Sequence, residues 1–167
     1  LVVVGPPGIG KSYGIEAQLK EANFLGTKIG GGEEKYEIIK GAISPPQLYR
    51  KLYEHSAEDH VLVLDDCDIE DEEALNLIKA ALDSCDKRII SWFKNAAWLE
   101  KDDIPSQFEF KGSVIFLTNV DFANARGRKA THLNAVVSRV HYMDMEIHSA
   151  RDRLLRIKQV VLRGNML

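Results

Sequence analysis

The first twelve residues constrain the fold more strongly than any other part of this sequence. The apolar, β-branched run Leu1–Val4 is typical of a fully buried strand, and the glycine-rich loop Gly5–Ser12 (GPPGIGKS) follows it directly. From Lys11 to about Asn23, apolar residues recur at the spacing of a helix. A strand, a glycine-rich loop and a helix in this order are the context that a phosphate-binding loop requires.

The loop predicts binding of a nucleoside triphosphate, with ATP and Mg²⁺ as the expected cofactors. Glycines let the backbone bend so that successive amides face the phosphates, and the N-terminus of the helix adds partial positive charge. We expect Lys11 to reach the β and γ phosphates and the Ser12 hydroxyl to ligate Mg²⁺. The predicted nucleotide-binding residues are Gly5, Pro6, Pro7, Gly8, Ile9, Gly10, Lys11, Ser12 and Tyr13.

Strands and helices alternate along the rest of the chain. Apolar runs predict further strands at Tyr36–Ile39, Val61–Leu64, Val114–Leu117 and Val140–Met145. Helical spacing predicts helices from Ser44 to about His55, around Leu75–Leu82 and over Ser149–Leu162. In the first of these helices, Ser44 can cap free amides and Pro45 suits the first turn. The alternation predicts an α/β fold, in which a central parallel sheet carries helices on both faces and ligands bind at the carboxyl ends of the strands.

The predicted strand Val61–Leu64 ends in two carboxylates, Asp65 and Asp66. This matches the Walker B pattern, in which the first carboxylate holds the Mg²⁺ shell and the second orients a water for attack on the γ phosphate. A solvated acidic turn at the end of a strand is the alternative. On the Walker B interpretation, Ser12 and Asp65 are the metal ligands and Asp66 is the catalytic base, with Asp68 as a reserve candidate.

These motifs resemble those of the AAA+ ATPases, over nearly the whole chain and in the same order. Asn119, after the strand Val114–Leu117, is similar to the polar sensor residue of that family, and Arg139, before the last predicted strand, is similar to its finger arginine. The resemblance implies that Asn119 positions the attacking water and that Arg139 projects toward the nucleotide of a neighbouring subunit in a ring or open arc. An asparagine that merely ends a strand and a surface arginine are the alternatives, and Arg126 and Arg128 compete for the arginine role.

The resemblance also implies the domain organisation and the catalytic set. Residues 1–148 would form the P-loop NTPase core of the AAA+ large subdomain, and residues 149–167 only the start of a small helical lid or a C-terminal helix. The implied catalytic residues are Lys11, Asp66, Asn119 and Arg139. The small size is consistent with a compact phage-type or replication-type member.

The sequence departs from the family pattern in three places. Asp66 stands where glutamate is usual, and its shorter carboxylate makes slow hydrolysis a real alternative. The stretch Lys40–Ile43 leads straight into the helix at Ser44 and leaves no aromatic loop for gripping a polypeptide. Only Ser149–Leu162 represents the lid, and its sensor arginine is not assigned. A role on DNA, or in a replication or recombination assembly, is therefore favoured over protein unfolding.

The stretch from Lys87 to Lys111 is the least regular, and its alternating apolar pieces suggest a hairpin or an excursion. It holds Trp92 and Trp98 among basic neighbours, an arrangement that can stack on nucleic acid. Simple packing is the favoured alternative, because aromatic residues bury large apolar areas in most domains. The basic cluster Arg126–Lys129 either contacts phosphates or forms a solvated loop.

Composition excludes several classes of function. The net charge is −3, so attraction to nucleic acid would need a local basic patch. Cys67 and Cys85 do not make a disulfide framework, and the five histidines show no metal-ligand spacing. No apolar run is long enough to cross a bilayer and no signal peptide is recognised, so we expect a cytoplasmic protein without a membrane partner.

The sequence therefore predicts a self-associating ATPase that remodels a DNA or protein substrate. One alternative is a phosphate-loop kinase, a closed monomer or dimer that transfers the γ phosphate to a small molecule. The other is a nucleotide-dependent binding module with slow turnover, which Asp66 makes credible.

Overall fold

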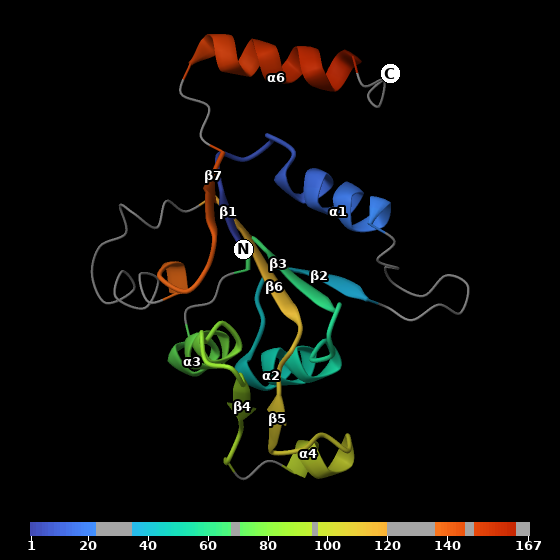
Figure 1. Ribbon diagram of the computed structural model, residues 1–167, viewed down its shortest axis with the longest axis vertical. Coiled ribbons are helices and arrows are strands. Elements are labelled where there is room, and N and C mark those ends of the chain that lie inside the picture. The colour runs from blue at the N-terminus through green and yellow to red at the C-terminus, as the bar shows by residue number, and fades with distance from the viewer. Residues whose placement is uncertain (23–34, 68–70, 95–96, 120–135, 146–148, 163–167) are drawn as a thin grey trace.

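The computed structural model describes residues 1–22, 35–67, 71–94, 97–119, 136–145 and 149–162. Its central sheet has five parallel strands (Figure 1). In order across the sheet they are β2 (Tyr36–Lys40), β3 (Val61–Asp65), β6 (Ser113–Thr118), β1 (Val2–Val4) and β7 (Tyr142–Asp144). The predicted α/β fold with a parallel sheet is confirmed, and all five expected strands are present.

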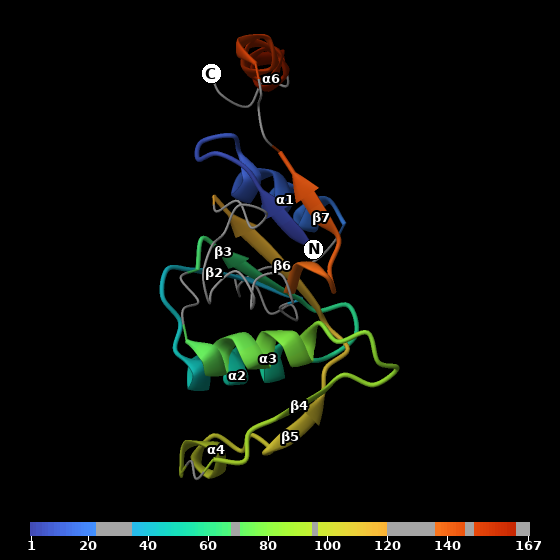
Figure 2. The ribbon, with the colours of Figure 1, turned by 90° about the vertical axis from the view of Figure 1, so that its left-hand side faces the viewer.

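Helices cover both faces of this sheet, as expected. On one face lies α1 (Lys11–Glu21), and on the other lie α2 (Pro45–Glu54) and α3 (Glu72–Ala81) (Figure 2). Side chains of a strand alternate between the two faces. Val63 accordingly packs in the same cluster as Leu19 of α1, whereas Leu62 and Leu64 pack with α2 and α3. Asp65 follows Val63 by two residues, so its side chain lies on the same face of the sheet, the one that α1 covers.

The start of α2 differs from the prediction in one detail. Ser44 occupies the N-cap position, but its side chain makes no capping hydrogen bond. Pro46, at the second position of the helix, has no amide hydrogen to donate, so one of the two amides that a capping serine usually binds is missing. At the start of α3, by contrast, the Asp71 carboxylate accepts a hydrogen bond of 2.8 Å from the backbone amide of Glu73.

The irregular stretch between Lys87 and Lys111 contains the expected hairpin. Strand β4 (Ile89–Ser91) pairs antiparallel with β5 (Gln107–Glu109), and α4 (Ala97–Lys101) joins them. Both ribbon views place this unit beyond α2 and α3, on the side away from α1 (Figures 1 and 2). The hairpin therefore does not extend the central sheet.

Aromatic side chains attach the hairpin to α2. The centroid of the Tyr49 ring lies 5.7 Å from that of Trp92, 6.0 Å from that of Trp98 and 5.2 Å from that of Phe108. The Tyr49 hydroxyl donates a hydrogen bond of 2.8 Å to the carbonyl of Pro105, and burial raises the pKa of Tyr49 to about 12. Trp92 and Phe108 are buried as well. The packing interpretation of the two tryptophans is confirmed.

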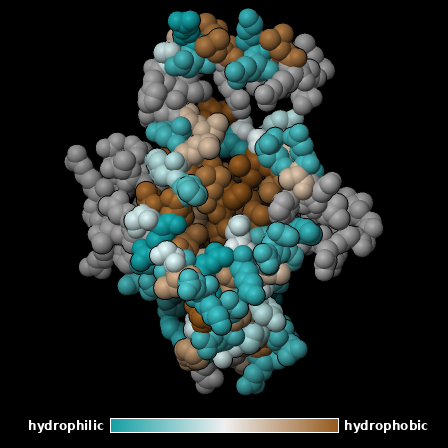
Figure 3. Space-filling view, in the orientation of Figure 1, coloured by the Kyte–Doolittle hydropathy of each residue, from teal (hydrophilic) through white to brown (hydrophobic). Residues whose placement is uncertain are grey.

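Helix α6 (Ala150–Leu162) matches the helix expected over 149–162 and stands apart from the sheet (Figures 1 and 2). The space-filling view shows apolar surface on this helix (Figure 3), and its side chains at Leu154, Leu155, Ile157 and Val161 are exposed. Its assignment to a lid stays a prediction. No helix in the described ranges is long and apolar enough to cross a membrane. The basic cluster at 126–129 and Asp68 lie outside the described residues.

The aromatic contacts predict how the hairpin contributes to stability. Replacing Phe108 with alanine should lower the free energy of unfolding by about 3–5 kcal/mol, because it leaves a cavity against Tyr49. Phe93 in the same hairpin is 78% exposed, so Phe93→Ala should change the free energy by no more than about 0.5 kcal/mol. Urea unfolding of both variants checks this, and equal losses would contradict the packing.

Candidate functional site

The loop between β1 and α1 has a backbone that only glycine adopts at low energetic cost. Gly8 and Gly10 have φ of 79° and 84°, in the left-handed region. Gly10 is the N-cap of α1, no side chain caps this helix, and no acidic residue lies in its first turn. The positive end of the helix therefore favours an anion at this position.

Lys11 is the first residue of α1 and is only 8% exposed. Its ammonium donates hydrogen bonds to the carbonyls of Gly5, at 2.8 Å, and Pro6, at 3.1 Å. It also donates to Oδ1 of Asn119, at 2.6 Å. These three acceptors satisfy a buried charge that would otherwise be strongly unfavourable. The positive charge is thus held at the inner side of the loop.

Asn119 links this lysine to the second aspartate of the acidic strand end. Its Nδ2 donates a hydrogen bond of 2.9 Å to Oδ2 of Asp66. Asp66 has a φ of 49°, in the left-handed region, and its amide donates to the carbonyl of Leu117 at 2.8 Å. The predicted catalytic residues Lys11, Asn119 and Asp66 therefore form one connected chain of side chains.

The first aspartate, Asp65, is buried and has a different partner. The Nζ of Lys40, the last residue of β2, lies 3.1 Å from Oδ2 of Asp65. The two residues are register partners on neighbouring strands, so their side chains share one face of the sheet. The sequence does not reveal this pair, because no local pattern shows that β2 and β3 are neighbours.

Not every predicted site residue lies in this group. Ser12 is half-buried in the first turn of α1, and Tyr13 beside it is exposed. Arg139 is exposed and precedes β7, whereas the loop follows β1, and β1 and β7 run parallel. Arg139 therefore lies at the amino edge of the sheet, and the loop lies at the carboxyl edge.

The two cysteines are free thiols, as expected. Burial raises the pKa of the Cys67 thiol, which donates a hydrogen bond to the carbonyl of Ile39 at 3.2 Å. A thiol with a raised pKa remains protonated and is a poor nucleophile.

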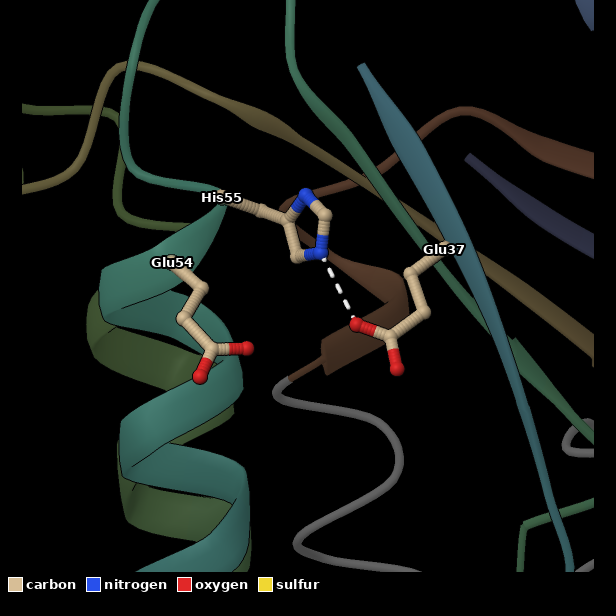
Figure 4. A group of neighbouring side chains, drawn as sticks. All are labelled: Glu37, Glu54 and His55. Carbon is tan, nitrogen blue, oxygen red and sulfur yellow. Dashed lines mark hydrogen bonds and ion pairs between the residues drawn. The ribbon is translucent and has the colours of Figure 1, made fainter. Parts of the chain in front are cut away.

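A second group of ionisable side chains lies on the other face of the sheet, and sequence spacing did not reveal it. Glu37 on β2 and Glu54 and His55 at the end of α2 place three possible metal-ligand atoms within 4.8 Å of one another (Figure 4). However, the ammonium of Lys51 lies 3.0 Å from Glu37 and 2.8 Å from Glu54. Both carboxylates already have a cation, so we interpret this group as a structural ion-pair network.

Within this network, His55 is almost fully buried, and its Nε2 lies 3.0 Å from Oε2 of Glu37. The hydrogen bond with His55 lowers the pKa of Glu37, burial opposes this, and the contact with Lys51 lowers the pKa further. A carboxyl whose pKa is lowered on folding stabilises the fold above its unfolded pKa, and this contribution is lost as the pH falls through the folded pKa.

This direction gives a pH-dependent prediction. Glu37→Gln should lower the free energy of unfolding by about 1 kcal/mol at pH 7, because the pair is partly exposed. The difference from wild type should shrink as the pH falls below the ordinary pKa of glutamate and then through the lowered pKa of Glu37. Urea unfolding at pH 7 and at acid pH measures it. Glu54→Gln is the matched control, since Glu54 contacts Lys51 but not His55. A pH-independent difference would contradict the linkage.

Comparison with known proteins finds a phage relative that matches the whole chain. No protein-family model matches the chain. An uncharacterized 36.7 kDa protein from the nrdC-mobD intergenic region of Enterobacteria phage T4 is 38% identical over 171 residues, which cover all of this chain. The match covers 51% of the phage protein, so the chain spans about half the length of that relative. The name of this relative states no activity, so it assigns none to this chain.

Proposed function

We propose that this chain is the core of an AAA+-type ATPase, which binds ATP with Mg²⁺ through the loop Gly5–Ser12 and hydrolyses it. The observation that carries the proposal is the chain of side chains from Lys11 through Asn119 to Asp66. It joins a buried ammonium at the glycine-rich loop after β1 to a carboxylate at the end of β3, and β6 lies between these two strands. Phosphoryl transfer needs positioned charges of both kinds on either side of the γ phosphate.

Binding follows from the loop and the start of α1. The amides of the loop and of the first helical turn would receive the phosphate oxygens. Lys11 would exchange its bonds with the carbonyls of Gly5 and Pro6 for bonds with the β and γ phosphates. A charged ligand then replaces neutral acceptors, which strengthens each hydrogen bond that the lysine makes.

The residues beside the loop fit the cation that accompanies ATP. A buried carboxylate, Asp65, and a hydroxyl, Ser12, are hard oxygen donors of the kind that Mg²⁺ prefers. These two residues would hold the ion, which supplies charge neutralisation for the phosphates when bound. Asp65 lies on the face of the sheet that α1 covers, and Ser12 lies in the first turn of α1.

Hydrolysis would depend on Asp66 and Asn119. Once Lys11 turns to the phosphates, Oδ1 of Asn119 is free to accept a hydrogen bond from a water. Nδ2 of Asn119 meanwhile keeps the Asp66 carboxylate in place, so that it can accept a proton from the same water. Because the aspartate is shorter than glutamate, the proposal includes slow turnover, and a nucleotide-dependent binding module is the second candidate function.

The position of Arg139 supports a shared site. Since Arg139 lies at the edge of the sheet opposite to the loop, it would reach a triphosphate only in another subunit. We therefore extend the proposal to a ring or open arc of subunits in which Arg139 acts in trans. Remodelling of DNA, or of a DNA-replication or recombination assembly, is the work proposed for it.

Two substitutions test the ATPase directly. Lys11→Ala should weaken ATP binding by about tenfold to hundredfold, because it removes the charged partner of the phosphates. Asp66→Asn should preserve binding and lower turnover about 100-fold or more. Isothermal titration with Mg²⁺ and a phosphate-release assay measure the two effects.

The matched controls are Lys20→Ala, on the exposed surface of α1, and Asp59→Asn, which precedes the amino end of β3. Both should behave as wild type. A wild-type protein that takes up no ATP would sink the proposed function, and unchanged turnover in Asp66→Asn would remove the assigned base.

A mixing experiment tests the sharing of sites. Arg139→Ala and Lys11→Ala chains should each be inactive alone and should recover part of the wild-type rate when mixed, since a mixed interface combines an intact loop with an intact arginine. Arg151→Ala, an exposed residue of α6, is the control and should hydrolyse ATP alone. Activity of Arg139→Ala alone, with transfer of phosphate to a small molecule, would instead favour a kinase.

A further inference from the structure

The strongest feature that the proposed mechanism leaves unused is the pair between Lys40 and Asp65. The ammonium of Lys40 lies 3.1 Å from the carboxylate, and the Asp65 side chain is only 6% exposed. The Lys40 side chain is 67% exposed. A buried carboxylate is thus paired with a lysine whose side chain is mostly exposed to solvent.

This pair occupies the place where a metal ion would bind. A cation that coordinates Asp65 must approach within about 2.1 Å of a carboxylate oxygen, the usual Mg²⁺ distance. An ammonium hydrogen-bonded to that carboxylate would then lie a few ångströms from the ion, and two positive charges at that separation repel strongly in a partly buried site. Lys40 and a metal ion therefore cannot both hold Asp65 in its present position.

Lys40 is able to leave. It is the last residue of β2 and the long stem of the side chain is mostly exposed, so the ammonium can turn into solvent without disturbing the sheet. Asp65, by contrast, is fixed by its place in β3 and by burial. The exchange therefore moves one exposed side chain and leaves the backbone unchanged.

We propose that Lys40 is an internal competitor for Mg²⁺, which neutralises Asp65 when no metal is bound and is displaced when Mg²⁺ arrives with the nucleotide. This inference rests on the proposed function and adds a residue that sets how much Mg²⁺ the site requires. Lys40 also prevents Asp65 from remaining a buried, unpaired charge in the metal-free protein, a state that is strongly unfavourable.

The test uses a fluorescent, non-hydrolysable ATP analogue. It measures the Mg²⁺ midpoint, which is the Mg²⁺ concentration that gives half of the maximal increase in affinity for the analogue. In Lys40→Met the midpoint should fall about twofold to tenfold, because the competing ion pair is gone. Lys40→Arg keeps the charge and should have a midpoint near that of wild type. Lys20→Met removes the same charge from the exposed pair with Glu16 on α1 and should shift the midpoint by less than about twofold.

Titration of the analogue in EDTA completes the design. Its affinity without metal should be the same in Lys40→Met as in Lys20→Met. Weaker metal-free binding in Lys40→Met alone would show that Lys40 binds phosphate. An unchanged or raised Mg²⁺ midpoint in Lys40→Met would show that Lys40 does not compete with the ion. Either result overturns this inference and leaves the ATPase proposal standing. If wild type binds no analogue with Mg²⁺ present, the ATPase proposal fails first.

Discussion

Strand β6 pairs with β1 on one side and with β3 on the other, and this pairing sets the distance between the loop and the carboxylates. Neighbouring strands lie about 4.8 Å apart, so β1 and β3, which flank β6, are two strand spacings apart. The register keeps their carboxyl ends level, because Val4 pairs with Thr118 and Asp65 with Leu117. Asn119 follows β6 and therefore lies between the lysine of the loop and the second aspartate. A short polar side chain is enough to connect them.

The charges of the site are paired in the ligand-free protein in a way that a ligand can replace. Lys11 binds two loop carbonyls and Asn119, and Asp65 binds Lys40. Burying either charge alone would be strongly unfavourable, so the fold needs these partners before any nucleotide is present. A triphosphate with its cation offers opposite charges to the same two groups. The resting contacts therefore preserve the site, and a bound triphosphate with its cation would replace the neutral acceptors of Lys11 and the exposed Lys40 beside Asp65.

Local patterns predicted the elements, whereas the pairings between them were out of reach. Continuous apolar runs such as Val61–Leu64 marked the strands because a parallel sheet is buried on both faces. The spacing of the glycines predicted the loop, because Gly8 and Gly10 adopt a left-handed backbone that other residues rarely adopt. Strand order is set by packing of the whole chain, so local patterns do not reveal that Lys40 lies beside Asp65, or Glu37 beside His55. The absence of a capping bond at Ser44 could have been predicted locally, because Pro46 has no amide hydrogen to donate.

The parallel sheet also limits how subunits could share a site. Residues that follow strands gather at one edge, and residues that precede strands gather at the other. Arg139 precedes β7 and the loop follows β1, so a contact between them joins the amino edge of one sheet to the carboxyl edge of the next. Such a contact is heterologous, since the two surfaces differ, and repeated heterologous contacts form rings when the rotation closes and open arcs or filaments when it does not. A two-fold dimer through either edge would bring like edges together and leave Arg139 away from the loop of its partner.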